Sequence, residues 1–270
     1  MKKSLILFFI LCLSCQINAQ VSWLADMNQS QSVAKQSDRL ILMDFWADWC
    51  GPCKIMDKEL WSLAEMQKLS SSFVCLKVNV DYDKRTAMEY STQAIPRLIL
   101  ISLSGETIWE STGYNNAESY LSVLRSIPGN VKGLNQVIGD LANNKNDART
   151  NLLVAKEYQN LGRDIKNNSL KIAFLNCSAK YLSVAEKNSK EADLNDEIEI
   201  YSTLNDVYYS KFKKALKKIE SLKSEPKDGQ LSELRHFILA KCYLNLSDPT
   251  KYQQEKLLIT SKELIDKLEN

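Results

Sequence analysis

Two cysteines separated by two residues are the clearest candidates for chemistry in the chain. Cys50 and Cys53 enclose Gly51 and Pro52, directly after Trp49. If this segment opens a helix, the two sulfurs lie one turn apart, within reach of a disulfide, which needs Cα atoms about 5.5 to 6 Å apart. A cysteine at a helix start faces unpaired backbone N–H groups and the positive end of the helix dipole, which favour its thiolate. We therefore expect Cys50 to be the nucleophile and Cys53 to resolve the mixed disulfide that Cys50 forms with a substrate.

The same spacing is compatible with two structural uses, a stabilising disulfide or half of a zinc site. A four-ligand zinc site needs further ligands, but the chain has a single histidine, His236, and no second close pair of cysteines beyond the leader region. We therefore expect no metal and no other cofactor. Cys75, Cys177 and Cys242 lie in apolar stretches and are expected to be small buried side chains, and His236 has no evident partner.

The residues around the pair predict an alternation of strands and helices. A continuous apolar run with one acid, residues 40–45, predicts a strand buried on both faces that ends shortly before Cys50. Further strands are expected at 73–80, 97–103 and 106–112, and helices at 54–69, 86–90 and 116–127, after an N-terminal element around 23–37. This order, βαβαββα, predicts an α/β sheet with helices on both sides.

Beyond Pro128-Gly129 the pattern changes to apolar residues at helical spacing, without a convincing strand. A Tyr-x-x-Leu pattern recurs at Tyr158, Tyr201 and Tyr243, which are 43 and 42 residues apart. Three stacked helical hairpins, resembling tetratricopeptide repeats with lengthened helices, and an irregular helical bundle are both compatible with this pattern. We expect few contacts to cross the two helix breakers.

The segment Asp-Phe-Trp-Ala-Asp-Trp-Cys-Gly-Pro-Cys-Lys, which begins at Asp44, resembles the active-site segment of thioredoxin. Residues 81–96 continue this resemblance in register, and it covers roughly residues 38–127. It implies a thioredoxin fold in which Asp44 is a buried acid near the second cysteine. Burial would raise its pKa and suit it to accept the proton of Cys53, while Lys77 lies close by. The alternative for Asp44 is a satisfied buried carboxylate without a kinetic role.

The resemblance also implies where a substrate binds. Pro96 matches the family's cis-proline, which packs opposite the cysteines and leaves neighbouring backbone groups free to pair with an extended substrate. The alternative is a trans proline that opens an edge strand. Arg97 departs from the Thr that is usual at this position, and its charge would favour acidic partners unless it is simply solvated. The residues expected to contact substrate are Trp49, Gly51, Pro52, Ile95 and Pro96.

The first nineteen residues predict a secretory signal peptide. Two lysines precede an apolar run at 5–13, and a polar stretch then ends at Ala19. The run is too short for a membrane-spanning helix, which needs roughly 20 apolar residues. Cys15 loosely matches a lipid-attachment site, which is the alternative. We expect an exported protein, periplasmic or secreted, that is divided into a signal peptide (1–19), a thioredoxin-like domain (20–128) and an all-helical domain (129–270).

Charge excludes one class of partner, because 35 basic and 33 acidic residues among 270 leave a net charge of +2 and no field that would attract nucleic acid. The expected function is that of an exported thiol–disulfide oxidoreductase acting on disulfide-containing client proteins. The Gly-Pro pair between the cysteines is associated with the reducing members of the resembled family. We therefore expect a disulfide reductase that receives electrons from a membrane thiol carrier. The alternatives are a disulfide oxidase or isomerase, and a partner-binding protein that uses the fold as a platform.

Overall fold

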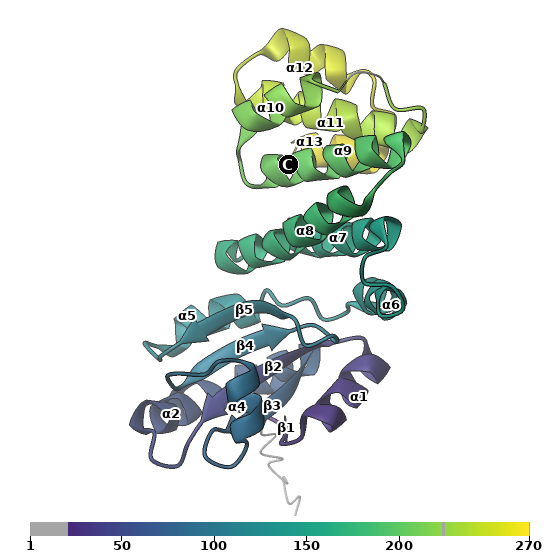
Figure 1. The fold of residues 1–270 in the computed structure, drawn as a ribbon. Coiled ribbons are helices and arrows are strands. Elements are labelled where there is room, and N and C mark those ends of the chain that lie inside the picture. Colours follow the sequence, from purple (N-terminus) through teal and green to yellow (C-terminus); the bar gives the residue numbers. More distant parts are fainter. Residues whose placement is uncertain (1–20, 223–224, 270) are drawn as a thin grey trace, which may run out of the picture.

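The computed structural model describes residues 21–222 and 225–269, so the expected signal peptide and Cys15 lie outside the described residues (Figure 1). A five-stranded sheet has the strand order β1-β3-β2-β4-β5. β1, β3 and β2 run parallel to one another, whereas β4 is antiparallel to β2 and β5 to β4. The expected strands all form, although the third ends early because Ser102 and Gly105 make a turn. The strands are β1 (Trp23–Leu24), β2 (Leu40–Trp46), β3 (Phe73–Asn79), β4 (Arg97–Ile101) and β5 (Thr107–Thr112).

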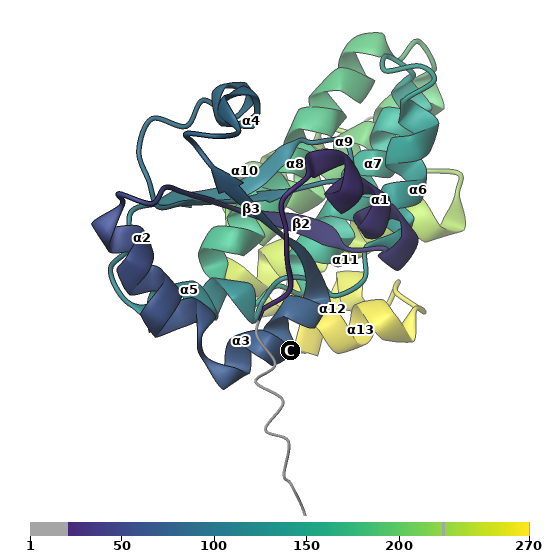
Figure 2. The ribbon, with the colours of Figure 1, turned by 90° about the horizontal axis from the view of Figure 1, so that it is seen from below.

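Helices cover both faces of the sheet (Figure 2). Side chains alternate along β2, so its odd-numbered residues face one core and Leu40 and Leu42 face the other. Asp44 continues the second series, which places it beneath the helix that carries Cys53. The helices are α1 (Met27–Ser37) and α4 (Lys84–Glu89) on the first face, and α2 (Gly51–Met56), α3 (Ala64–Leu69) and α5 (Ala117–Leu124) on the second.

The single helix expected at 54–69 is interrupted, which corrects the expectation from sequence. A π-helical turn, η1 (Asp57–Trp61), follows α2, and Leu63 is extended before α3 begins; a 3-10 turn, η2 (Ser70–Ser72), follows α3. The consecutive residues Leu60 and Trp61 expose only 0% and 4% of their surface, which the wider turn permits. Apolar spacing alone does not distinguish this turn from a regular helix.

The second half of the chain is helical, as expected. Tyr158, Tyr201 and Tyr243 each lie in the first helix of a pair, and α9 packs against both α7 and α11. The pairs stack away from the sheet (Figure 1). A repeat of tetratricopeptide type stays a prediction. The helices are α6 (Lys132–Leu141), then the pairs α7 (Ala148–Arg163) with α8 (Asn168–Asn188), α9 (Ala192–Tyr208) with α10 (Phe212–Glu220) and α11 (Gly229–Asn245) with α12 (Pro249–Lys256), and finally α13 (Lys262–Glu269).

The expectation that few contacts cross residues 128–129 is wrong. One apolar core includes Leu100 and Trp109 of the sheet region, residues 21–127, together with Tyr158 and Phe174 of the helical region, the described residues after 128. α8 packs against β5, the edge strand of the sheet (Figure 1). Covering an edge strand with a helix is a common way to protect it from pairing with other chains. The domain boundary itself stays a prediction.

Polar contacts also join the sheet region to the helical region, at the boundary between them that is here called the seam. Glu106, just before β5, accepts hydrogen bonds from the hydroxyl groups of Tyr181 at 2.7 Å and Tyr158 at 3.2 Å. The ammonium of Lys180 lies 2.5 Å from its other oxygen. Trp109 of β5 donates its indole N–H to Ser169 of α8 at 3.1 Å. Three helical side chains therefore converge on one carboxylate of the sheet region.

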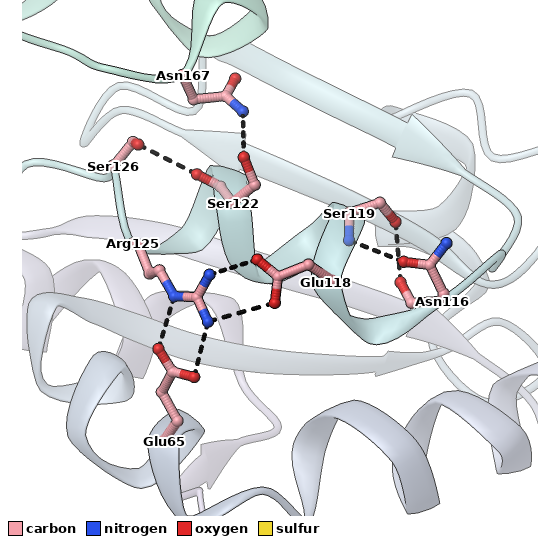
Figure 3. A network of polar contacts seen from close by, with 8 residues as sticks. All are labelled: Glu65, Asn116, Glu118, Ser119, Ser122, Arg125, Ser126 and Asn167. Carbon is pink, nitrogen blue, oxygen red and sulfur yellow. Dashed lines mark hydrogen bonds and ion pairs between the residues drawn. The ribbon is translucent and has the colours of Figure 1, made fainter.

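A second polar network joins α5 to its neighbours (Figure 3). Arg125 pairs with Glu65 of α3 and with Glu118 of α5, each at a closest distance of 2.6 Å. Asn167, the N-cap residue of α8, donates its side-chain amide to Ser122 of α5 at 3.0 Å. Since α5 also contacts the π turn η1, the helical region is connected to the elements beneath the cysteine pair.

Candidate active site

Cys50 and Cys53 form a disulfide at the start of α2, with their Cα atoms 5.3 Å apart. Cys50 is the N-cap residue of that helix, and its Sγ accepts the backbone N–H of Cys53 at 3.2 Å. Pro52 occupies the first turn, where a backbone N–H would have no partner within the helix in any case. The Cys50 sulfur therefore lies where backbone N–H groups and the helix dipole favour a thiolate.

The disulfide is covered on most sides. Cys50 and Cys53 expose 3% and 4% of their surface and pack against Ala47 and the partly buried Ile95. Gly51 and Pro52 are exposed, and a Cβ added to Gly51 would meet no atom within 4 Å. The Gly51-Pro52 turn is therefore the open side of the disulfide.

The Ile95–Pro96 peptide bond is cis. The Pro96 carbonyl accepts the N–H of Gly113 at 2.8 Å, which anchors the proline to the segment after β5. Within residues 21–222 and 225–269, neither backbone group of Ile95 takes part in a hydrogen bond. Ile95 thus packs against the disulfide with both of its backbone polar groups unpaired among these residues.

Trp49 is held in place beside the disulfide although 69% of its surface is exposed. Its indole N–H donates to Asp81 at 2.9 Å, and the Asp81 N–H donates to Asn79 at 3.0 Å. The Asn79 amide reaches Asp48 at 3.4 Å. The turn at 79–83 is therefore tied to the active-site loop. It carries Tyr82, which lies between Asp81 and Asp83, is 83% exposed and was not among the residues expected to contact substrate.

Asp44 is buried to 98% on the face of the sheet beneath α2 and η1. Loss of hydration raises its pKa to about 7; the nearby Asp57 adds to this rise, whereas Lys77 and the Trp61 indole oppose it. Asp44 Oδ1 and Trp61 Nε1 have no hydrogen-bond partner among the described residues. The indole therefore lowers the pKa of the carboxyl by its proximity, without forming a hydrogen bond to it. A carboxyl with this pKa exchanges protons near neutral pH.

Lys77 lies directly opposite Asp44 in the pairing of β2 with β3. Its ammonium is 3.9 Å from Asp44 Oδ2 but 2.5 Å from Asp57 Oδ1, and it lies 5.2 and 5.0 Å from the ring centres of Trp23 and Trp46. The family resemblance placed Lys77 near Asp44, but Asp57 was not expected there. The spacing held the signal, because Asp57 follows Cys53 by four residues and so lies on the same side of the helix.

Arg97 does not present its charge to the catalytic face, and it is not solvated either. Its side chain exposes 12% of its surface and pairs with Glu110 at 2.6 Å. It also donates to the Tyr90 carbonyl at 2.6 Å and to Thr92 at 3.2 Å. Arg97 therefore ties the segment before Pro96 to β5.

The remaining cysteines and the histidine have structural surroundings. Cys75, Cys177 and Cys242 are buried, and loss of hydration raises the pKa of each thiol to about 12. The expectation that His236 lacks a partner is wrong, since Nδ1 lies 2.7 Å from Glu255 and Nε2 lies 3.5 Å from Glu225. In the described ranges no group of three or more His, Cys, Asp or Glu residues is placed to hold a metal ion.

Known proteins resemble the sheet region. The thioredoxin family model matches residues 20–126. Thioredoxin of Bacillus subtilis is 35% identical over 86 residues, 32% of this chain and 80% of its own length. Thioredoxin of Alicyclobacillus acidocaldarius is 34% identical over 104 residues, 38% of this chain and 94% of its own length. The chain belongs to the thioredoxin family.

One further relative and two solved structures are also similar to this region. Thioredoxin-T of Drosophila melanogaster is 41% identical over 76 residues, and the chain spans 46% of its length. A solved thioredoxin from Thermus thermophilus, 20% identical, covers 39% of this chain and 85% of its own with a TM-score of 0.36. A structure named DsbH oxidoreductase, 16% identical, covers 40% and 83% with a TM-score of 0.36.

Thioredoxin-family membership and the intact cysteine pair together define the chemistry. The chain is a thiol–disulfide oxidoreductase that acts on disulfide-containing substrates. None of the helices within residues 21–222 and 225–269 has the length and apolar character needed to cross a membrane.

Proposed function

We propose that this thioredoxin-family protein is an exported reductase of disulfides in client proteins. The observation that carries the proposal is the Gly51-Pro52 pair between the cysteines, with Cys50 capping the helix. Gly-Pro is associated with the reducing members of the family, and thioredoxin itself has a potential of about −270 mV. The curated relatives with this resemblance are named thioredoxin.

The proposed reaction begins with the reduced pair. The Cys50 thiolate attacks a client disulfide, forms a Cys50–client disulfide and releases one client sulfur, which takes up a proton. Asp44 then accepts the proton of Cys53, whose thiolate attacks Cys50 and releases the second client sulfur. Two electrons pass to the client and leave the Cys50–Cys53 disulfide. The pKa of about 7 at Asp44 supports this role, because a base of that strength is half ionised at neutral pH.

Export and electron supply complete the proposal. The leader composition of residues 1–19 supports secretion to the periplasm or beyond, with lipid attachment at Cys15 as the alternative. An oxidising compartment does not return the pair to its reduced form. A membrane thiol carrier is therefore the donor that the proposal requires.

Equilibrium with glutathione tests the direction. We expect the Cys50–Cys53 disulfide to have a potential near that of thioredoxin, about −270 mV. A potential near that of a strong oxidase, about −120 mV, would show that the protein introduces disulfides. Because the redox potential of the Cys50–Cys53 pair separates a reductase from an oxidase, the wild-type protein is sufficient for this measurement.

We further propose that the helical region selects partners. A groove of about 540 Å³ between α8, α9 and α10 supports this proposal; it is lined on α8 by Asn176 and Ser183 and on the other two helices by Asp206 and Lys214. Stacked helical hairpins bind peptides on such surfaces. Ser183→Arg, in a Cys53→Ser background that accumulates mixed disulfides, should reduce capture of native partners. Asn168→Arg, on an exposed part of α8 outside the groove, is the control, and equal capture by both variants would contradict this proposal.

A further inference from the structure

The ammonium of Lys77 is shared unequally between two carboxylates. Asp57 holds it at 2.5 Å, whereas Asp44 Oδ2 is 3.9 Å away. The ring centres of Trp23 and Trp46 lie 5.2 and 5.0 Å from the ammonium and add cation–π attraction. The ammonium therefore lies at the outer limit of ion pairing with Asp44 and beyond hydrogen-bonding distance of it.

We propose that Asp57 is a positioning residue that holds the Lys77 ammonium away from the Asp44 carboxyl. The inference rests on the proposed role of Asp44 as proton acceptor for Cys53, and it deepens that role. The Asp57 side chain bonds Lys77 and acts on Asp44 through it.

Burial explains why Lys77 pairs with Asp57 in preference to Asp44. The Asp57 side chain is 41% exposed and remains hydrated, whereas the Asp44 side chain is 3% exposed. An ionised Asp44 carboxylate would lack the hydration that it has in an unfolded chain, and only a close cation would compensate that loss. Asp57 withholds the cation, so Asp44 keeps its proton until the pH approaches about 7.

The charged groups around Asp44 leave no other candidate for this effect. β3 contributes Lys77 and the buried thiol of Cys75, and β4 places the apolar Leu98 opposite Asp44. The π turn contributes Asp57 and the uncharged Trp61 indole. Among the described residues, Asp57 is thus the one anion that both repels the Asp44 carboxylate and binds its cation.

The position of Asp57 in the chain links this device to the resolving cysteine. Asp57 caps the C-terminal end of α2, and its backbone N–H donates to the carbonyl of Cys53. The same residue therefore fixes Lys77 through its side chain and the last turn of the active-site helix through its backbone. Only the side chain is expected to set the proton affinity of Asp44, so a side-chain substitution separates the two roles.

The test measures the pKa of Asp44 directly, by carboxyl ¹³C NMR of the full-length oxidised protein. Asp57→Asn should lower this pKa by about one unit or more, because the freed ammonium moves onto Asp44, and an opposite charge at contact lowers a carboxyl pKa by about 1 to 3 units. Asp57→Glu should restore the wild-type value. Glu59→Gln, which removes an exposed carboxylate of the same turn that bonds Tyr114, should leave it unchanged.

A double-mutant cycle separates positioning from direct repulsion. Lys77→Met should raise the Asp44 pKa, and adding Asp57→Asn to Lys77→Met should then change it far less than Asp57→Asn changes the wild type. An equal decrease in both backgrounds would overturn the inference, because Asp57 would then act by its own charge alone. An unchanged Asp44 pKa in Asp57→Asn would overturn it as well.

The rate of resolution distinguishes this inference from the proposed function. If the pH midpoint of mixed-disulfide resolution moves with the Asp44 pKa, both stand. If the Asp44 pKa falls in Asp57→Asn while the pH profile of resolution stays fixed, the positioning by Asp57 stands and the role of Asp44 as proton acceptor fails.

Discussion

Two carboxylates of the sheet region, one partly buried at the seam with the helical region and one fully buried beneath the cysteine pair, have opposite surroundings. Glu106, at the seam with the helical region, accepts two tyrosine hydroxyl groups and an ammonium within 3.2 Å. Asp44, beneath the cysteine pair, has one oxygen without a hydrogen-bond partner among the described residues and a single cation at 3.9 Å. A carboxylate that only holds a structure is expected to be saturated, because an unpaired buried charge is costly. The poor satisfaction of Asp44 therefore favours a chemical role.

The cysteines differ between the two regions in the same way. Cys50 stands at the beginning of a helix, where its sulfur accepts a backbone N–H, beside an exposed turn. Cys177 and Cys242 lie within helices, and burial raises the pKa of both thiols to about 12. Position within a helix, and not the residue type, separates a reactive thiol from an apolar filler.

Replacing the two active-site cysteines should give the largest effects, and different ones. Cys50→Ser should reduce disulfide reduction to the uncatalysed rate, because the nucleophile is missing. Cys53→Ser should still attack a client and then accumulate as a covalent mixed disulfide, because the resolving thiol is missing. Non-reducing electrophoresis and mass spectrometry of each variant with a disulfide-containing protein measure this. Adducts on Cys50→Ser and none on Cys53→Ser would reverse the assignment of roles.

Asp44→Asn should slow turnover by about a hundredfold at neutral pH, the lower range of general base catalysis, and less at high pH, where Cys53 ionises unaided. Stopped-flow measurement of mixed-disulfide resolution against pH checks this. A rate equal to that of the wild type at every pH would remove Asp44 from the mechanism.

The same substitution should change how stability depends on pH. The pKa of Asp44 is about 7 in the folded protein and about 3.9 in an unfolded chain, so between these values the folded state alone holds the proton. The contribution of Asp44 to the stability of the wild type is therefore most favourable below about pH 4, falls as the pH rises through this window, and is least favourable above about 7, by about 4 kcal/mol at most. Asp44→Asn should lack this decrease, and urea unfolding at pH 5 and pH 8 compares the two proteins.

Glu106→Gln should act at the seam and leave the chemistry intact. It removes the charge that faces Lys180 and weakens the bonds from Tyr158 and Tyr181, which should cost about 1 to 3 kcal/mol of unfolding free energy. The matched control is Glu118→Gln, whose carboxylate pairs with Arg125 at the surface and should change stability by less than about 1 kcal/mol. Denaturant unfolding followed by fluorescence and by circular dichroism measures both. Separate transitions for the two probes in the wild type would show that the shared core does not unite the regions.

The reactive residues could be predicted from the sequence better than the contacts that support them. The apolar run at 40–45 and the spacing of Cys50 and Cys53 are local patterns, so the strand and the disulfide could be expected from them. Asp57 was missed because its partner, Lys77, lies 20 residues away and is brought to it by sheet pairing. His236 was likewise judged without a partner because Glu255 reaches it from the next helix of the chain.

The seam between the regions was misjudged for a related reason. Apolar residues such as Phe174 have helical spacing whether they face another helix or the sheet. Periodicity therefore predicts which face of a helix is buried, but not which element packs against that face. Pro128 and Gly129 do lie between two helices, since α5 stops at Leu124 and α6 starts at Lys132. A helix break, however, does not prevent the following helices from packing back against β5.

The smallest expected effect concerns Tyr82, and it tests whether client contact extends beyond the residues shared with the family. Tyr82 exposes 83% of its surface on a turn that Asp81 ties to Trp49, so its backbone is held next to the active-site loop. An aromatic contact of this kind is worth about 1 kcal/mol, which corresponds to about fivefold in affinity. Tyr82→Ser should therefore raise KM for a protein client by about fivefold and leave kcat unchanged.

Oxidised glutathione is too small to touch both the sulfurs and this turn, so its reduction should not change. Met88→Ser, at the far end of α4 with 74% exposure, is the control and should leave both substrates unaffected. If Met88→Ser raised KM as much as Tyr82→Ser, the contact would be a diffuse apolar surface; if neither did, clients would be gripped elsewhere, and the helical region would be the first place to look.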